Sequence, residues 1–202
     1  MDLQGDLITM NHFSASRRTV CFLAALVVST TLHAKLASAA SPAERYVERV
    51  GNGILAAARA GSVSQFRSLM QRNGAISTIA IYSLGPYRKK LPAARKREYY
   101  KLVSKHISKV FANHSKKLAG QSLTASSSRS KGRSVIVKSK LKYSSGKTSN
   151  VTWRLIKRGS GFKVFDVNVQ GIWLASTQKT DFISILRRNK GDINALFSYL
   201  KK

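Results

Sequence analysis

The stretch GFKVFDVNVQGIWLASTQKTDF, Gly161 to Phe182, decides how this 202-residue chain is organised. Its first part alternates, because Phe165, Val167 and Val169 are apolar and the residues between them are polar. Side chains two positions apart lie on one face of a β-strand, so this part predicts a strand with one apolar face. A glycine then ends the strand, and we expect a helix to begin near Ser176.

Segments with the same period of two come before this stretch. Glycines separate them, which predicts an antiparallel meander. In one segment Val135 and Val137 share a face, and lysines occupy the other, so the sheet should have an apolar side and a basic, wet side. The segment 126–134 is interpreted as a Ser/Lys/Arg-rich loop. The sequence predicts four strands in all, at Gln121–Ser128, Arg133–Tyr143, Asn150–Lys157 and Phe162–Val169.

Apolar residues at three- and four-residue steps predict helices before and after the strands. Ser41, Pro42 and Glu44 have the spacing of a capping box, and Gly120 is the expected C-cap of the longest helix. We therefore expect an α+β fold in which N- and C-terminal helices cover one face of a curved sheet. The expected helices are Ser41–Gly61, Ser62–Gly74, Ala93–Leu118 and two that begin near Ser176 and Asp192, with a short apolar segment at Ile76–Leu84.

The first 39 residues have the pattern of a cleavable signal peptide. Two arginines, Arg17 and Arg18, precede an apolar run at 19–32, which is too short to span a bilayer. A small-residue cleavage site follows at 37–39. The single cysteine, Cys21, lies inside this segment. We interpret residues 1–39 as a signal peptide and residues 40–202 as one exported domain, with a bacterial periplasm as the expected compartment.

The net charge of +28 indicates polyanionic partners. In a cytoplasmic protein it would indicate nucleic acid. In the periplasm the available polyanions are the head groups of anionic phospholipids and lipopolysaccharide, so no nucleic acid is expected. A solvated basic surface without a specific partner is the alternative that composition leaves open.

The sequence offers little for catalysis. His106 and His114 lie eight residues apart on an expected helix, too far for one metal ion, and are interpreted as core or edge histidines. Glu44 and Glu48 are accompanied by arginines and are interpreted as surface pairing partners. The chain lacks a nucleophile elbow, a P-loop and a dinucleotide fingerprint. We expect no catalytic residues, no metal and no cofactor.

An apolar sheet face needs a cover, and composition alone does not choose between a solid core and an apolar cleft. The order of three motifs resembles a known family. These motifs are Leu84-Gly85-Pro86-Tyr87-Arg88; Phe162-Lys163-Val164-Phe165-Asp166-Val167 followed by Gln170-Gly171-Ile172-Trp173-Leu174; and Asp181-Phe182, Ile185-Leu186 and Gly191. The family is the toluene-tolerance, or MlaC-type, family of periplasmic lipid-binding proteins, which includes a branch associated with hopanoid biosynthesis.

The resemblance implies a monomeric carrier that holds a membrane lipid in a cleft between sheet and helices. It also implies exchange with an inner-membrane ABC transporter and an outer-membrane lipoprotein complex. Gln170 replaces the usual Glu, and Trp173 replaces a small Ser, which keeps a polycyclic hopanoid open as cargo beside a phospholipid. Asp166 matches the family's Asp and is expected to anchor the sheet.

The alternative function is a basic module that binds anionic lipid or lipopolysaccharide through its surface, without a cavity. The expected lipid-binding residues are Ile79, Tyr82, Leu84, Tyr99, Val103, Val135, Val137, Trp153, Leu155, Phe165, Val167, Val169, Ile172 and Trp173.

Overall fold

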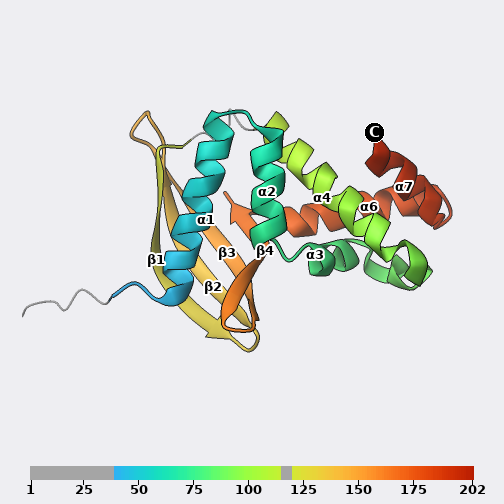
Figure 1. Ribbon diagram of the computed structural model, residues 1–202, viewed down its shortest axis with the longest axis horizontal. Coiled ribbons are helices and arrows are strands. Elements are labelled where there is room, and N and C mark those ends of the chain that lie inside the picture. Colours follow the sequence, from blue (N-terminus) through green and yellow to red (C-terminus); the bar gives the residue numbers. More distant parts are fainter. Residues whose placement is uncertain (1–38, 115–119) are drawn as a thin grey trace, which may run out of the picture. The chain divides into compact units, whose positions relative to one another are not determined.

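The computed structural model describes residues 39–114 and 120–202 (Figure 1). Nearly all of the expected signal peptide lies outside these residues. In the described ranges, none of the helices combines the length and the apolar character needed to cross a membrane.

The sheet is an antiparallel meander of five strands in the order β1-β2-β3-β4-β5. The α+β class and the meander are confirmed, but the predicted number of four strands is wrong. The strands are β1 (Ser122–Lys131), β2 (Ser134–Lys142), β3 (Thr148–Arg158), β4 (Gly161–Val169) and β5 (Ile172–Trp173).

The fifth strand exists because the chain reverses in two residues after β4. Gln170 and Gly171 both have positive φ, 51° and 89°, as in the two-residue hairpin turns that match strand twist. Ile172 then pairs with Val169, and Trp173 pairs with Asn168. Positive φ at a glutamine is uncommon, so Gln170 was only a weak signal for this turn.

The predicted loop at 126–134 is also wrong over most of its length. Strand β1 continues to Lys131, with an irregularity between Ala125 and Ser127, and the turn is confined to Gly132 and Arg133. Pairing with β2 supplies the hydrogen bonds that the serine-rich composition by itself does not favour.

The helices of the first half are α1 (Pro42–Arg59), α2 (Val63–Asn73), α3 (Ile76–Ser83) and α4 (Lys96–Asn113), with 3-10 turns at Gly85–Lys90 and Ala93–Arg95 between the last two. The capping box of α1 is present: the Ser41 side chain accepts from the Glu44 N–H, and the Glu44 carboxylate accepts from the Ser41 N–H. Glu48, expected to be a surface partner of arginine, instead accepts a hydrogen bond of 2.9 Å from the Ala125 N–H of β1.

Helix α4 is shorter than the predicted Ala93–Leu118. The first residues of the predicted helix, Ala93–Arg95, form a 3-10 turn, and the C-cap of α4 is His114 rather than Gly120. Residues 115–119 lie outside the described ranges. The Gly120 carbonyl accepts a hydrogen bond of 2.8 Å from Arg59 at the end of α1.

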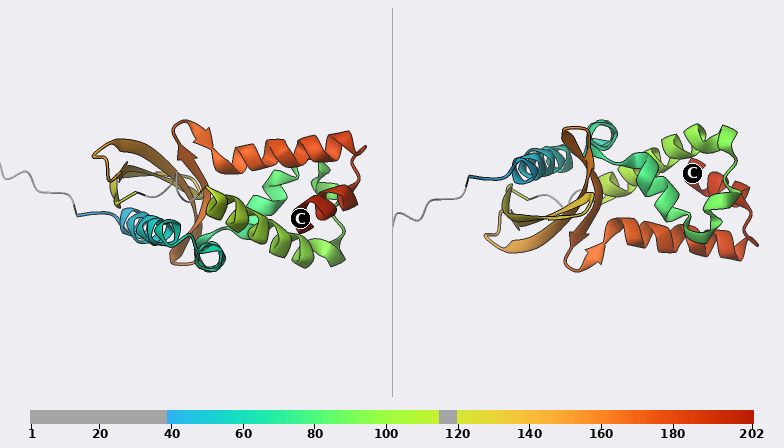
Figure 2. Two further views of the ribbon diagram at one scale, coloured as in Figure 1. Left: turned by 90° about the horizontal axis from the view of Figure 1, so that it is seen from above. Right: turned by 90° about the horizontal axis from the view of Figure 1, so that it is seen from below.

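Helices α6 (Leu174–Arg188) and α7 (Ile193–Lys201) close the chain. Helix α6 begins two residues before the predicted Ser176, directly after β5, and continues past the end of the sheet (Figure 2).

The apolar side chains form two main cores, which corrects the expected single cover over the sheet. Helix α1 lies across the apolar face of the sheet, where Val47, Val50 and Leu55 pack against β1, β2 and β3 (Figure 1). The second core joins α3, α4, α6 and α7 around Tyr99 and Phe182. The C-terminal helices therefore pack mainly with other helices, and only the start of α6 is tied to β4.

A bulge in β4 changes which side chains share a face. Arg154 pairs with Asp166, but Leu155 pairs with Val164, so Phe165 is the extra residue. Val164 thus faces α1 together with Val167. The ring of Phe165 instead packs edge-on against Tyr82 of α3, with 5.3 Å between the ring centroids. The predicted common face of Phe165, Val167 and Val169 is wrong at Phe165.

Asp166 joins the sheet to α6. One carboxylate oxygen, Oδ1, accepts from the Val167 N–H at 2.9 Å and from the Ala175 N–H at 2.8 Å, and the residue is only 3% exposed. Ala175 is in the first turn of α6, whose N–H groups have no partner within the helix. The expected anchoring role of Asp166 is confirmed, and its partner is a helix start rather than a cation.

Replacing Asp166 tests this junction. Asp166→Ala leaves two backbone donors without their acceptor, which should lower the free energy of unfolding by about 1–3 kcal/mol for each donor. Asp166→Asn retains an oxygen at the Oδ1 position and should cost less. Urea unfolding of the two variants measures the difference. Equal losses would show that the hydrogen bonds to Oδ1 contribute nothing beyond packing.

Candidate functional site

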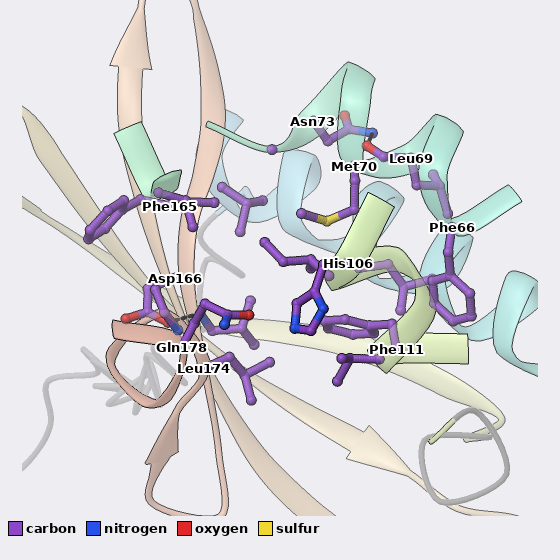
Figure 3. A pocket seen from close by; sticks show the side chains of 18 of the residues that line it. Phe66, Leu69, Met70, Asn73, His106, Phe111, Phe165, Asp166, Leu174 and Gln178 are labelled. Atoms are coloured by element: carbon purple, nitrogen blue, oxygen red, sulfur yellow. Dashed lines mark hydrogen bonds between the residues drawn. The ribbon is translucent and has the colours of Figure 1, made fainter. Parts of the chain in front are cut away.

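Two neighbouring cavities lie between the sheet and the helices. The first has a volume of about 250 Å³ and is bounded by side chains of α1, α2, α4, β3, β4 and α6, with Ile79 of α3 and Tyr199 of α7 (Figure 3). The second, of about 360 Å³, lies between α1, α4 and strands β1 to β4. Both are in or close to the range of roughly 300–1,000 Å³ that is usual for small-molecule sites.

The two cavities share part of their walls, so they are adjoining compartments of one space. The shared side chains are all apolar and come from helices on one side and strands on the other. They are Ile54, Val110, Phe111, Trp153, Val167 and Leu174.

Trp153 of β3 is the largest of the shared residues on the sheet. Its Nε1–H donates to Ser139 Oγ at 2.9 Å, and that hydroxyl donates to the Val151 carbonyl at 3.1 Å. Both side chains are buried, so this chain of hydrogen bonds satisfies the indole without water. The ring is thereby held in place as part of both compartments.

Helices α2 and α4 form the wall opposite the sheet. Phe66 of α2 is buried and packs against Phe111 of α4, with ring centroids 5.6 Å apart. Leu69 and Met70 follow Phe66 on the same side of α2 (Figure 3). Val110 lines both compartments and is 41% exposed, and Tyr199 is 38% exposed. The space therefore reaches the surface beside Val110 and Tyr199.

Polar side chains gather in the first compartment. His106 of α4 lies between the rings of Phe182 and Tyr199, at centroid distances of 6.0 and 5.3 Å, and Gln178 and Asp181 of α6 line the same space. Burial lowers the pKa of His106, and the nearby Asp181 carboxylate opposes this shift. Among the residues that the structure describes, His114 is the one ionisable side chain that lines the second compartment.

Asp166 also borders the first compartment. Burial raises the pKa of its carboxyl, against the effect of the two backbone N–H groups. Its second oxygen, Oδ2, is buried without a hydrogen-bond partner among the described residues. Within these residues, no three His, Cys, Asp or Glu side chains lie close enough together to hold a metal ion.

The family model of the MlaC protein matches residues 45–202. The chain belongs to the MlaC family. The predicted resemblance is thus confirmed at the level of the family. A comparison with curated protein sequences found no match.

A solved structure with the same fold is that of a phospholipid-binding protein from Ralstonia solanacearum, determined in complex with a phospholipid. The two proteins share 18% sequence identity over 80% of this chain and 96% of the other, with a TM-score of 0.67. At this sequence identity the match establishes that this MlaC-family chain and the Ralstonia solanacearum protein share a fold.

Five of the fourteen predicted lipid-binding residues line the space in this MlaC-family protein. Trp153 and Val167 line both compartments, Ile79 and Phe165 line the first, and Val169 lines the second. The Phe165 ring itself is turned away from the side chains around His106 (Figure 3).

The other nine residues lie outside the cavity lining. Trp173 and Tyr82 are half-buried on the far side of β4, where they pack around Arg154 and Phe165, and Ile172 is 59% exposed. The remaining six are buried in the two cores: Leu84, Tyr99 and Val103 among the helices, and Val135, Val137 and Leu155 beneath α1.

Much of the helical wall was missed by the sequence prediction. The apolar stripes of α1, α2 and α4 were visible as stripes, but core packing and cavity lining have the same period of three to four residues. His106, predicted to be a core or edge residue, is a half-buried residue of the cavity wall.

The lowered pKa of His106 predicts a pH dependence. The folded state binds the proton less readily than the unfolded chain, whose imidazole has a pKa near 6.5. The stability contributed by neutral His106 is therefore complete above that pH and is lost as the pH falls toward the folded-state pKa. Urea unfolding between weakly acidic and neutral pH should show this loss in the wild type.

The loss should be smaller in His106→Gln. The matched control is His114→Gln, which makes the same substitution at an exposed position at the end of the same helix. His106→Gln should reduce the pH dependence more than this control does. A pH dependence that is unchanged in His106→Gln would show that His106 is not the source of the loss of stability.

Proposed function

We propose that this protein is a carrier that holds the hydrocarbon part of a phospholipid in the two adjoining compartments. The observation that carries this proposal is an apolar space, shared between sheet and helices, in a chain of the MlaC family. The phospholipid bound by the Ralstonia solanacearum protein of the same fold supports the class of ligand.

The shape of the space favours a lipid with more than one chain. The wall formed by Trp153, Val167 and Phe111 borders both compartments, so each compartment can take one acyl chain. The polar side chains His106, Gln178 and Asp181 all belong to the first compartment. We place the head group toward this polar side, near the surface opening beside Tyr199.

The free energy of transfer suits exchange of lipid between the protein and a bilayer. Each buried methylene contributes about 0.8 kcal/mol, so two acyl chains gain on the order of 20 kcal/mol relative to water. A bilayer gives the chains nearly the same environment. Transfer between bilayer and protein is then close to neutral, which allows loading and release without a large energy source at either step.

The setting that we propose follows from the family and the N-terminal segment. Residues 1–39 act as a signal peptide, and residues 40–202 work in the periplasm as a monomeric domain. The protein shuttles lipid between the inner and outer membranes as the soluble component of an ABC-type transport system. A hopanoid is the alternative cargo.

The direct test is the lipid content of the protein. The mature chain, purified without detergent, is extracted and analysed by mass spectrometry, with native mass spectrometry giving the stoichiometry. Phospholipid bound in a fixed ratio is expected. A chain that carries no lipid and takes up none from vesicles would overturn the proposal, and a hopanoid in place of phospholipid would change the cargo.

Filling the cavity from the sheet side separates lipid binding from stability. In Val167→Phe the added ring enters empty space at the wall common to both compartments, so the free energy of unfolding should be maintained or rise. The ring displaces roughly two methylenes of ligand, which corresponds to a roughly tenfold loss of lipid affinity. Competition with a fluorescent fatty acid measures the affinity.

The matched control is Ile136→Phe. Ile136 is half-buried on β2 and pairs with Arg154, on the face of the sheet opposite the cavities. The Ile136→Phe variant carries an added ring of the same size and should bind lipid as the wild type does. Equal binding by both variants would place the lipid outside this space.

A further inference from the structure

The face of the sheet opposite α1 carries a row of lysines. Lys138, Lys140 and Lys142 are exposed and alternate along β2 with Val137, Ser139 and Leu141, which are buried on the inner face. Alternate residues of a strand are about 7 Å apart, so the row presents evenly spaced charges along the strand.

The neighbours of this row are small and polar. Register places a serine, threonine or asparagine on both sides of every lysine, and these paired side chains are too short to cover the ammonium groups. These neighbours are Ser122, Thr124 and Ser127 on β1, and Thr148, Asn150 and Thr152 on β3.

Further basic residues extend the same face. Arg129 of β1 and Arg154 of β3 are both paired with Ile136 of β2, and Lys131 follows Arg129 two residues later. We call Arg129, Lys131, Lys138, Lys140, Lys142 and Arg154 the outer basic face.

Carboxylates do not neutralise the outer basic face. In the described part of the chain, the ion pairs are Arg95–Glu98 and Lys201–Glu98, both on the helical side of the molecule. Asp166 pairs with Arg154 in register and feels its charge, but it is 3% exposed, forms no ion pair with Arg154 and directs Oδ1 to backbone N–H groups, so it does not act on the lysine row. The remaining acidic residues of the described ranges lie on helices or directly before one: Glu44, Glu48, Asp181 and Asp192.

The β4–β5 edge of this face is apolar and aromatic. The Arg154 guanidinium lies 4.5 Å from the centre of the Trp173 ring, and the neighbouring Ile172 is 59% exposed. Tryptophan, an arginine stacked on it and a protruding aliphatic side chain are suited to the boundary between lipid head groups and acyl chains.

We propose that the outer basic face is a docking surface for an anionic phospholipid bilayer. The face has charge complementary to the bilayer, and its evenly spaced row suits many laterally spread head groups. The choice of a bilayer over other polyanions rests on the proposed function, since a lipid carrier must meet a membrane. Docking uses the face opposite the lipid space, so the two properties can be measured separately.

The test compares two sets of variants in vesicle sedimentation. The first set replaces the row, Lys138→Gln, Lys140→Gln and Lys142→Gln together. The matched control removes the same charge from exposed positions of α4: Lys96→Gln, Lys101→Gln and Lys105→Gln. The vesicles are phosphatidylcholine with or without phosphatidylglycerol.

The wild type should bind the vesicles with phosphatidylglycerol, and sodium chloride should weaken this binding. Each basic side chain near an anionic surface changes binding roughly fivefold, so loss of the row should weaken it roughly a hundredfold. The α4 control should change it much less. The single substitution Ile172→Ser should weaken the part of vesicle binding that remains at high sodium chloride concentration.

Several results would overturn the inference. One is wild-type vesicle binding that does not depend on phosphatidylglycerol. Another is an equal loss of vesicle binding in the two triple variants, which would show a diffuse charge effect. Preference for lipopolysaccharide micelles or an acidic protein, without binding to the vesicles, would also overturn it.

Lipid content is measured on the same samples. The row variant should retain its bound lipid. A wild type that binds vesicles through the row but carries no lipid would refute the proposed carrier function and leave the docking surface standing. The reverse result would refute the docking surface alone.

Discussion

The hydrogen bonds from Val167 and Ala175 to one oxygen of Asp166 fix where α6 starts relative to the sheet. The chain leaves β4, reverses through Gln170 and Gly171 and forms β5. The N–H of Ala175 then donates to this buried carboxylate. Since β4 and α6 both border the first cavity, the junction sets the distance between these two walls. The carboxylate remains next to an apolar cavity although burial raises its pKa, because the first turn of α6 needs an acceptor.

The space exists because the two cores do not merge. Helix α1 packs on the sheet, and α3, α4, α6 and α7 pack on one another. The side chains between these cores, such as Phe111, Trp153 and Leu174, are large and apolar, yet they leave two compartments open. Protein interiors are normally filled to crystal-like density, so a space of this size with an apolar lining is a strong indication of a hydrocarbon ligand.

The two faces of the sheet present different side chains. The inner face supplies Trp153 and Val167 to the walls of the cavities, and the outer face presents the lysine row of β2. Alternation along a strand makes this possible with few residues, because each successive side chain changes face. The β4 bulge adds a local exception that sends Phe165 to the outer side, where Arg154 and Trp173 lie.

The sequence by itself determined the α+β class, the antiparallel meander, the capping box at Ser41 and the two-sided character of the sheet. These features depend on local periodicity and on turn residues, which a linear pattern records directly. The family was also recognisable from the order of its motifs. Trp153 and Val167 were correctly assigned to the apolar face that lines the cavities.

Only the tertiary structure decided which apolar residues pack and which leave space. Tyr99 and Val110 belong to the same stripe of α4, but Tyr99 is buried in the helical core while Val110 opens onto both compartments. The fifth strand and the place of Phe165 likewise depend on a turn at Gln170 and a bulge, each of which is stabilised by pairing between strands. A void is a property of how separate elements meet, so no periodicity within one element can specify it.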